Sequence, residues 1–387
     1  MKPTLYRNLT VIFFAACSLG SHLANASQLT WDADGRANGV YGGNGIWNSK
    51  SALWEQDGKI TQWDNQAGLE AVFTGNAGTV RITKDVTAGL LTFDTADYLV
   101  AGKTLTLSGD APAITANANA TISAKLAGTS GFTKYGTGTL TLSASNTYSG
   151  GTVVNGGILK AGNAAAFGTG DIRITSGTLD IAGKSIANGI TLSGGNVINS
   201  AGSSIRIGNI NLGRNGNINT KGSSLIVNGT LAGSGSITGD VVINGTLTIG
   251  NSPGLLSVSG DASLEGLSAS IFEIGGKERG ISYDALDVGG TLFLDALIQV
   301  VLIDGFDSAS LRTGDSFDLI NWGSLVATDF DVGTQLDLSG VPLSSGLSWD
   351  TSGFLSNGTI TVVPEPSHMA LFVALGVAAI LLRRRRR

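Results

Sequence analysis

The sequence predicts an all-β protein whose body is a parallel β-helix, and three observations carry this prediction. Glycine supplies 57 of the 387 residues, and charged residues supply only 14%, although 42% of the chain is hydrophobic. Short alternating runs such as Leu140-Thr-Leu142 follow one another with Gly, Asn or Ser between them. Glycine is costly inside helices, and closely spaced short strands are typical of a stacked coil. The tripeptide Gly-Thr-Leu recurs at Gly138, Gly177, Gly229, Gly245 and Gly290.

Asn-Gly pairs mark predicted turns between these runs. The same four letters occur in close succession as Asn228-Gly-Thr-Leu231 and Asn244-Gly-Thr-Leu247. Asn-Gly favours a turn because both residues tolerate positive φ. Each turn of such a coil buries a few Leu, Ile or Val side chains on the turn below it. A β-sandwich is the alternative architecture for many short strands.

The first segment, residues 1–26, has the pattern of a secretory signal peptide. Lys2 and Arg7 precede a short apolar core, and the small residues that signal peptidase requires are Ala24 and Ala26. A lipoprotein signal is the alternative, with lipid attached to a cysteine in the apolar core. Either reading predicts export of the body.

The last segment, residues 364–387, has three parts. Pro364-Glu365-Pro366 precedes an apolar stretch from Met369 to Leu382, and five arginines, Arg383 to Arg387, end the chain. The apolar stretch predicts one short transmembrane helix, about 21 Å long against the ~30 Å of a bilayer core. Arginine keeps this end cytoplasmic, so the body lies outside the cytoplasmic membrane.

This three-part end resembles the PEP-CTERM sorting signal, with the motif, the apolar helix and the basic tail in the same order. The resemblance implies recognition by an exosortase, a membrane transpeptidase of Gram-negative bacteria, and cleavage near Pro364-Glu365-Pro366. The Sec export machinery and, transiently, the cytoplasmic membrane are then further partners. An ordinary tail anchor is the alternative for these residues.

The body that remains, residues 27–363, lacks the side chains that most catalytic sites use. Both histidines (His22, His368) and the single cysteine (Cys17) lie outside it, and 17 basic against 28 acidic residues give it a net charge of −11. This composition excludes Ser-His-Asp and Cys-His catalysis and His/Cys metal sites. It also disfavours nucleic-acid binding. We expect no cofactor, and only carboxylate chemistry stays open.

Residues 131–159 resemble the autotransporter-associated β-strand repeat. The residues that carry the resemblance are Lys134, Gly136, Gly138, Leu140, Leu142, Asn146, Tyr148, Gly150, Gly151, Thr152, Val154, Gly157 and Leu159. The resemblance implies a right-handed β-helix like that of a secreted passenger at a bacterial surface. Unlike autotransporters, the chain has no series of strands for an outer-membrane barrel at its C-terminal end.

Two segments flank the predicted β-helix. An N-terminal segment concentrates tryptophan, which either closes the open end of the coil or forms a platform on which sugars stack. The four tryptophans are Trp31, Trp47, Trp54 and Trp63. The predicted organisation is a signal peptide at 1–26, a Trp-rich cap at 27–100, a β-helix at 101–260, an acidic β segment at 261–363 and a sorting signal at 364–387.

The acidic segment raises the question of calcium, which carboxylates and carbonyl oxygens bind. Solvated turn residues are the alternative for its aspartates, and Asp32-Ala-Asp34-Gly35 is only a fragment of an EF-hand-like loop. The aspartates of the acidic segment are Asp304, Asp307, Asp315, Asp318, Asp329, Asp331 and Asp337.

These observations favour a non-enzymatic protein of the cell surface, outer membrane or extracellular matrix, sorted by an exosortase-type system. In family terms it would accompany exopolysaccharide and biofilm. Two alternatives stay open. One is a polysaccharide-active β-helix enzyme that uses aspartates such as Asp171, Asp180 and Asp240. The other is a glycan-binding adhesin.

Overall fold

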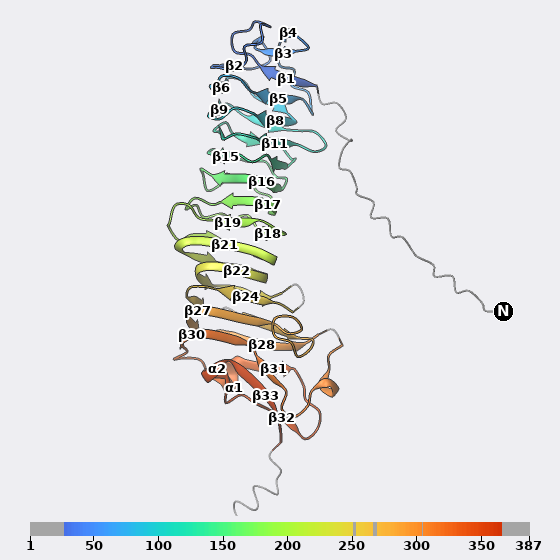
Figure 1. The fold of residues 1–387 in the computed structure, drawn as a ribbon, viewed down its shortest axis with the longest axis vertical. Coiled ribbons are helices and arrows are strands. Elements are labelled where there is room, and N and C mark those ends of the chain that lie inside the picture. The colour runs from blue at the N-terminus through green and yellow to red at the C-terminus, as the bar shows by residue number, and fades with distance from the viewer. Residues whose placement is uncertain (1–26, 251–252, 266–268, 304, 366–387) are drawn as a thin grey trace, which may run out of the picture.

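A computed structural model describes residues 27–365 except 251–252, 266–268 and 304. Within these residues the chain forms an elongated stack of short strands, with the N-terminal strands at one end and the C-terminal strands at the other (Figure 1). Nearly all strand pairs are parallel, and they join strands one turn apart. The prediction of an all-β solenoid, a β-helix of the right-handed type, is thereby confirmed.

The first of three faces begins with β1 and ends with β31. Thr133 pairs with Val153, and Val153 pairs with Arg173, so successive turns have equal length here. The strands on this face are β1 (Gln28–Trp31), β5 (Glu70–Phe73), β8 (Leu90–Phe93), β11 (Ala113–Ala116), β14 (Phe132–Tyr135), the starts of β16 (Thr152–Ala161), β17 (Ile172–Asp180), β21 (Ile210–Val227) and β22 (Thr230–Ile243), with β18 (Ile190–Leu192), β23 (Thr246–Ile249), β26 (Ala269–Ile274), β28 (Leu297–Leu302) and β31 (Leu336–Gly340).

The second face follows the first within each turn. Its register runs from Thr121 through Thr141 to Lys160, again on successive turns. It contains β2 (Gly45–Trp47), β6 (Thr79–Ile82), β9 (Tyr98–Gly102), β12 (Ala120–Ile122), β15 (Thr139–Leu142), the later parts of β16, β17, β21 and β22, and also β19 (Asn196–Ile198), β24 (Leu255–Val258) and the starts of β27 (Ala285–Leu294) and β30 (Ile320–Val326).

The third face completes each turn and is less regular. Asn146 and Asn188 lie where this face has no strand, and their side chains hydrogen-bond to backbone groups of neighbouring turns. The strands of this face are β7 (Val86–Ala88), β10 (Leu105–Leu107), β13 (Leu126–Ala127), β20 (Ile205–Ile207), β25 (Ala262–Leu264) and the ends of β21, β22, β27 and β30.

The core lies inside the coil and follows the alternation of the sequence. In β15, Leu140 and Leu142 are fully buried, whereas Thr139 and Thr141 between them face outward. Because a strand places successive side chains on opposite faces, each turn stacks its apolar residues on those of the next turn. The apolar cluster is continuous from Leu29 to Val362.

The two ends of the coil are closed by antiparallel strands. At the N-terminal end β3 (Trp54–Gln56) pairs with β1 and with β4 (Lys59–Thr61). At the C-terminal end β33 (Thr359–Pro364) pairs with β29 (Ser316–Asp318) and β32 (Leu347–Asp350). Antiparallel caps of this kind cover the exposed edge of a solenoid. The short helices that accompany the C-terminal sheet are η1 (Ser308–Ser310), α1 (Val332–Gln335) and α2 (Phe354–Asn357).

The coil is longer than the β-helix predicted at 101–260. The parallel ladders already include β5 and continue to β31. The sequence did not show this because the number of residues in one turn varies along the coil. Ala232 pairs with Thr248 across a short turn, whereas Gln299 pairs with Asp337 across a much longer one. Among the residues that the structure describes, no helix is long and apolar enough to cross a membrane. The helix predicted from Met369 to Leu382 lies outside those residues.

Candidate functional site

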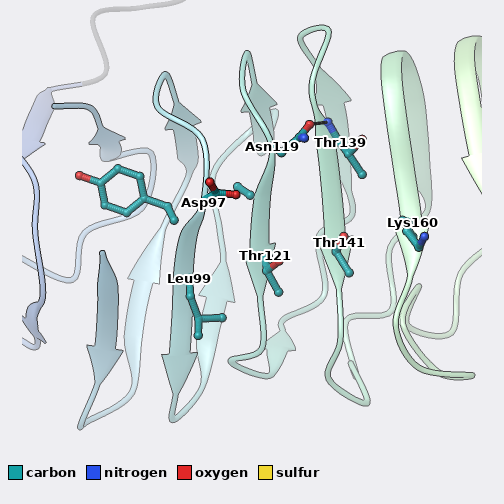
Figure 2. A pocket seen from close by; sticks show the side chains of 9 residues that line it. Asp97, Leu99, Asn119, Thr121, Thr139, Thr141 and Lys160 are labelled. Atoms are coloured by element: carbon teal, nitrogen blue, oxygen red, sulfur yellow. Dashed lines mark hydrogen bonds between the residues drawn. The ribbon is translucent and has the colours of Figure 1, made fainter. Parts of the chain in front are cut away.

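A shallow groove of about 550 Å³ crosses the second face over β9, β12, β15 and β16. Figure 2 shows the side chains that line it, spread over successive turns of the coil. Its lining residues are Asp97, Tyr98, Leu99, Asn119, Ala120, Thr121, Thr139, Thr141 and Lys160. Small polar and apolar side chains on a regular sheet leave this recess open, with somewhat more apolar than polar surface.

The register of the parallel strands orders the chemistry of the groove. Leu99, Thr121, Thr141 and Lys160 occupy equivalent positions on four successive turns. Parallel strands lie about 4.8 Å apart. Along the coil axis, an apolar side chain, two hydroxyl groups and an ammonium group therefore follow one another at about that spacing. An exposed carboxylate, Asp97, lies at the N-terminal side of the same groove.

Hydrogen bonds between turns hold the walls of the groove. The Asn119 Oδ1 accepts a 2.8 Å hydrogen bond from the backbone N–H of Thr139 on the next turn (Figure 2). Below the surface the Tyr98 hydroxyl donates to the carbonyl oxygen of Thr74 at 2.7 Å. Burial raises the pKa of Tyr98 to about 12, so this phenol is a structural donor.

Lys160 closes the C-terminal side of the groove and is partly neutralised there. Its Nζ lies 3.3 Å from Asp180 Oδ2 and 3.3 Å from the Ser200 hydroxyl. The carboxylate is buried, and its Oδ1 accepts from the backbone N–H of Ser200 and of Ala182. The pair therefore ties three turns together. Sequence analysis did not identify this groove, because only the register brings its residues together.

The repeat at 131–159 is built around a buried lysine. The Lys134 Nζ donates to the carbonyl oxygens of Gly136 at 2.8 Å, Gly138 at 2.7 Å and Gly156 at 2.9 Å. Burial lowers the pKa of Lys134 to about 8, and the three carbonyls use the three N–H donors of its ammonium form. A Cβ at Gly157, where φ is 55°, would lie 2.5 Å from the Gly138 carbonyl oxygen. This position therefore requires glycine.

Two further residues of the repeat connect turns. Asn146 accepts from the backbone N–H of Leu126 at 2.8 Å and donates to the carbonyl oxygen of Ala166 at 2.6 Å, which lie on the preceding and following turns. Tyr148 is fully buried, and its hydroxyl lies 2.7 Å from that of Thr152. The polar residues of the repeat thus stabilise the stack rather than forming a surface site.

The four N-terminal tryptophans form a cap and not a platform for sugars. Each is at most 1% exposed. The ring centroid of Trp47 lies 5.1 Å from that of Trp54 and 4.9 Å from that of Trp63, with edge-to-face angles of 63° and 80°. Trp31 packs on Trp54 at 5.0 Å. Because no ring face of these four reaches solvent, the prediction of a stacking platform is wrong. The apolar rings instead cover the first turn of the coil.

The aspartates considered for carbohydrate cleavage do not form a pair. Asp171 precedes β17 on the first face, whereas Asp180 ends that strand on the second face and is paired with Lys160. Asp240 lies at the start of the third-face part of β22, where it accepts from the backbone N–H of Asp261. Paired carboxylates for glycoside hydrolysis must face one another across the scissile bond, and these three are at different corners of the coil.

Most aspartates of the acidic segment have local structural roles. Asp307 and Asp331 cap the short helices η1 and α1. Asp315 pairs with Lys277 at 2.8 Å, and Asp318 pairs with Arg279 at 3.0 Å. Asp304 lies outside the described residues. In the described part of the chain, no group of three or more His, Cys, Asp or Glu side chains is placed to hold a metal ion.

A buried carboxylate that sequence analysis did not identify lies deep in the C-terminal half. Asp284 accepts from the backbone N–H groups of Gly254 and Glu273, each at 2.8 Å, and is inaccessible to solvent. Burial raises the pKa of Asp284 to about 7, against the opposing effect of the two N–H groups. It joins the start of β24, the end of β26 and the start of β27.

A second buried carboxylate, Asp32, lies in the N-terminal cap. Neither of its oxygens has a hydrogen-bond partner among the residues that the structure describes. Burial and the neighbouring Asp34 carboxylate raise the pKa of Asp32, against the opposing effect of the nearby backbone N–H groups of Gly35 and Arg36. Within the same described residues, the indole N–H groups of Trp47 and Trp54 also lack partners.

The predicted sorting motif begins in β33, the last strand of the described residues. Pro364 is the last residue of β33 and pairs with Leu347, and the backbone N–H of Glu365 donates to the carbonyl oxygen of Gly346 at 2.9 Å. The other residues of the predicted end signals lie outside the described part of the chain: Ala24, Ala26, Pro366, Met369, Leu382, Arg383 and Arg387.

Comparisons with known proteins concern the coil. Residues 132–161 match the family model of the passenger-associated-transport-repeat. An alignment over 181 residues is 40% identical to the adhesin BmaC autotransporter of Brucella suis biovar 1 (strain 1330), and it covers 44% of this chain and 5% of that protein. No solved structure matches significantly. The chain therefore contains a repeat of the autotransporter-passenger type within a β-helical body that is similar to part of a bacterial adhesin.

Proposed function

We propose that this chain is an exported, non-enzymatic adhesin of the bacterial surface, with the β-helix as a stiff rod that presents its outer faces to a ligand. The observation that carries the proposal is the 40% identity to an adhesin autotransporter over 181 residues, together with the passenger-type repeat. The dispersed aspartates and the body without His or Cys support a binding role over catalysis.

The groove on the second face is the proposed ligand site. Its hydroxyl groups, Thr121 and Thr141, lie between an apolar side chain and the Lys160 ammonium, and the buried tryptophans leave this face as the better place for a saccharide. Exopolysaccharide of the surrounding matrix is the proposed partner class. Hydroxyl and amide groups on a preformed sheet lower the protein's own ordering cost when a sugar binds.

Sorting through an exosortase-type system belongs to the same proposal. The motif begins at Pro364, the last residue of β33, so cleavage after this strand would release or transfer an intact β-helix. Its support is the order of motif, apolar stretch and arginines in the sequence.

The adhesin proposal is tested by attachment of the producing bacterium to a polysaccharide-coated surface. Deletion of the gene should reduce attachment, and the wild-type chain should restore it. A Thr121→Glu and Thr141→Glu double variant should restore surface display but not attachment. The matched control is Thr191→Glu, which is exposed on the first face outside the groove. Equal attachment of the deletion strain and the wild type would contradict the proposal.

A further inference from the structure

The Asp32 carboxylate occupies an unusual position in the N-terminal cap. Its side chain is inaccessible to solvent, and neither oxygen has a hydrogen-bond partner within the described part of the chain. Its backbone is fixed on both sides, because its N–H donates to the Leu53 carbonyl oxygen at 3.0 Å and it forms a parallel bridge with Gly42. The main chain that carries this buried carboxylate is therefore held in place.

A second carboxylate, Asp34, is held beside it. Asp34 Oδ1 accepts from the backbone N–H of Arg36 at 2.9 Å, and Oδ2 accepts from Asn38 Nδ2 at 3.2 Å. Neither Asp32 nor Asp34 takes part in any of the ion pairs formed by the described residues. Two acidic groups thus belong to the same short loop, and no described side chain neutralises them.

A buried carboxylate without a donor is costly, and native structures satisfy such groups by a partner, water or an ion. We propose that Asp32 and Asp34 bind a calcium ion in the N-terminal cap. Ca²⁺ is a hard cation that binds carboxylate, carbonyl and water oxygens in flexible coordination geometries, whereas Mg²⁺ requires a near-ideal octahedral geometry. A loop with two carboxylates suits Ca²⁺ better.

The site would act on the stability of the cap. Asp32 directly follows Trp31, the tryptophan that packs on Trp54 and on Phe73 of the first turn. A cation that neutralises the Asp32 carboxylate would therefore stabilise the loop after β1 against the aromatic cap. With two carboxylates, we expect affinity in the weak range of about 10⁻⁴ to 10⁻³ M that is found in extracellular modules.

Terbium luminescence tests the site, because Tb³⁺ replaces Ca²⁺ and is excited through nearby tryptophan. The full chain should give sensitised Tb³⁺ emission that excess Ca²⁺ displaces. Asp34→Asn, at an exposed position, should reduce this emission at least tenfold while circular dichroism stays unchanged. Asp57→Asn, in the exposed turn between β3 and β4 of the same cap, should leave it unchanged.

Thermal unfolding supplies a second readout that does not depend on terbium. Ligand binding to the folded state alone raises Tm, so about 10 mM Ca²⁺ should raise it by about 2 °C or more in the wild type. The shift should be absent in Asp32→Asn and Asp34→Asn. Tb³⁺ emission that is equally strong in Asp34→Asn, or a Tm unaffected by Ca²⁺ in the wild type, would overturn the proposal.

Discussion

The Lys134 Nζ donates a 2.9 Å hydrogen bond to the carbonyl oxygen of Gly156, which lies one turn further along the coil. The same ammonium group also serves the carbonyls of Gly136 and Gly138, so one side chain satisfies three backbone acceptors at the corner between the first and second faces. Lys134 thus links two turns of the coil through hydrogen bonds to their backbone carbonyls, which explains why a lysine occupies a fully buried position.

Replacing this lysine by an apolar residue should destabilise the body. Lys134→Met keeps the aliphatic stem but leaves three partly buried carbonyls without their donor, and we expect a loss of about 2–4 kcal/mol in the free energy of unfolding. Urea unfolding followed by circular dichroism measures it. The control is Lys125→Met at an exposed position, which should change the free energy by less than about 0.5 kcal/mol. A neutral Lys134→Met would contradict the role assigned to this side chain.

Asn146 should be as important as the lysine, because it bonds to two other turns. Asn146→Ala removes the acceptor of Leu126 N–H and the donor to the Ala166 carbonyl, both in a buried setting. We expect a cost of about 2–4 kcal/mol, measured by chemical denaturation. Asn117→Ala deletes an exposed hydrogen bond to Asp94 and should cost less than about 1 kcal/mol. Equal effects of the two substitutions would argue against Asn146 as a connector of turns.

The aromatic cap gives a third prediction. Trp54 contacts Trp31, Trp47, Trp63 and Phe73, and its side chain is fully buried. Trp54→Ala should therefore cost about 3–5 kcal/mol and expose the first turn of the coil to proteolysis. Limited proteolysis with N-terminal sequencing of the fragments would detect this opening. Cleavage that starts first at the C-terminal end in the variant would show that the tryptophans do not protect the N-terminal end.

The pKa of Asp284 predicts a dependence of stability on pH. Burial raises this pKa from 3.8 to about 7, so the folded protein binds the proton more tightly than the unfolded chain does. The contribution of Asp284 is therefore fully present below about pH 4 and is lost as pH rises through about 7. The wild type should lose free energy of unfolding relative to Asp284→Asn over that range. A difference between the two that stays constant from pH 4 to pH 7 would show that Asp284 does not titrate there.

Much of the central coil could be predicted from the sequence. The alternation around Leu140 and Leu142 gave the buried face of β15, and Gly-Thr-Leu marked second-face strands at Leu140 and Leu179. Turns of nearly equal length follow one another there, so a pattern is visible. Toward the C-terminal end the turns lengthen, as the pairing of Gln299 with Asp337 shows, and no sequence period remains.

The site residues were harder to predict, because their roles depend on contacts between turns. A tryptophan-rich segment fits both a sugar platform and a cap, and only the packing of Trp47 against Trp54 and Trp63 distinguishes them. The groove depends on a register that places Thr121 beside Thr141, which no local pattern specifies. The sequence around Asp284 does not distinguish it from an exposed aspartate in a turn, and only the packing of the coil shows that it is buried.

The central claim, that the β-helical body is displayed at the cell surface, is tested most directly by antibody labelling of intact cells of the producing bacterium. An antibody against the body should label intact and permeabilised wild-type cells to the same extent. Labelling should fall on intact cells, but not on permeabilised ones, when Pro364, Glu365 and Pro366 are replaced by alanine. Labelling of wild-type cells only after permeabilisation would contradict the account.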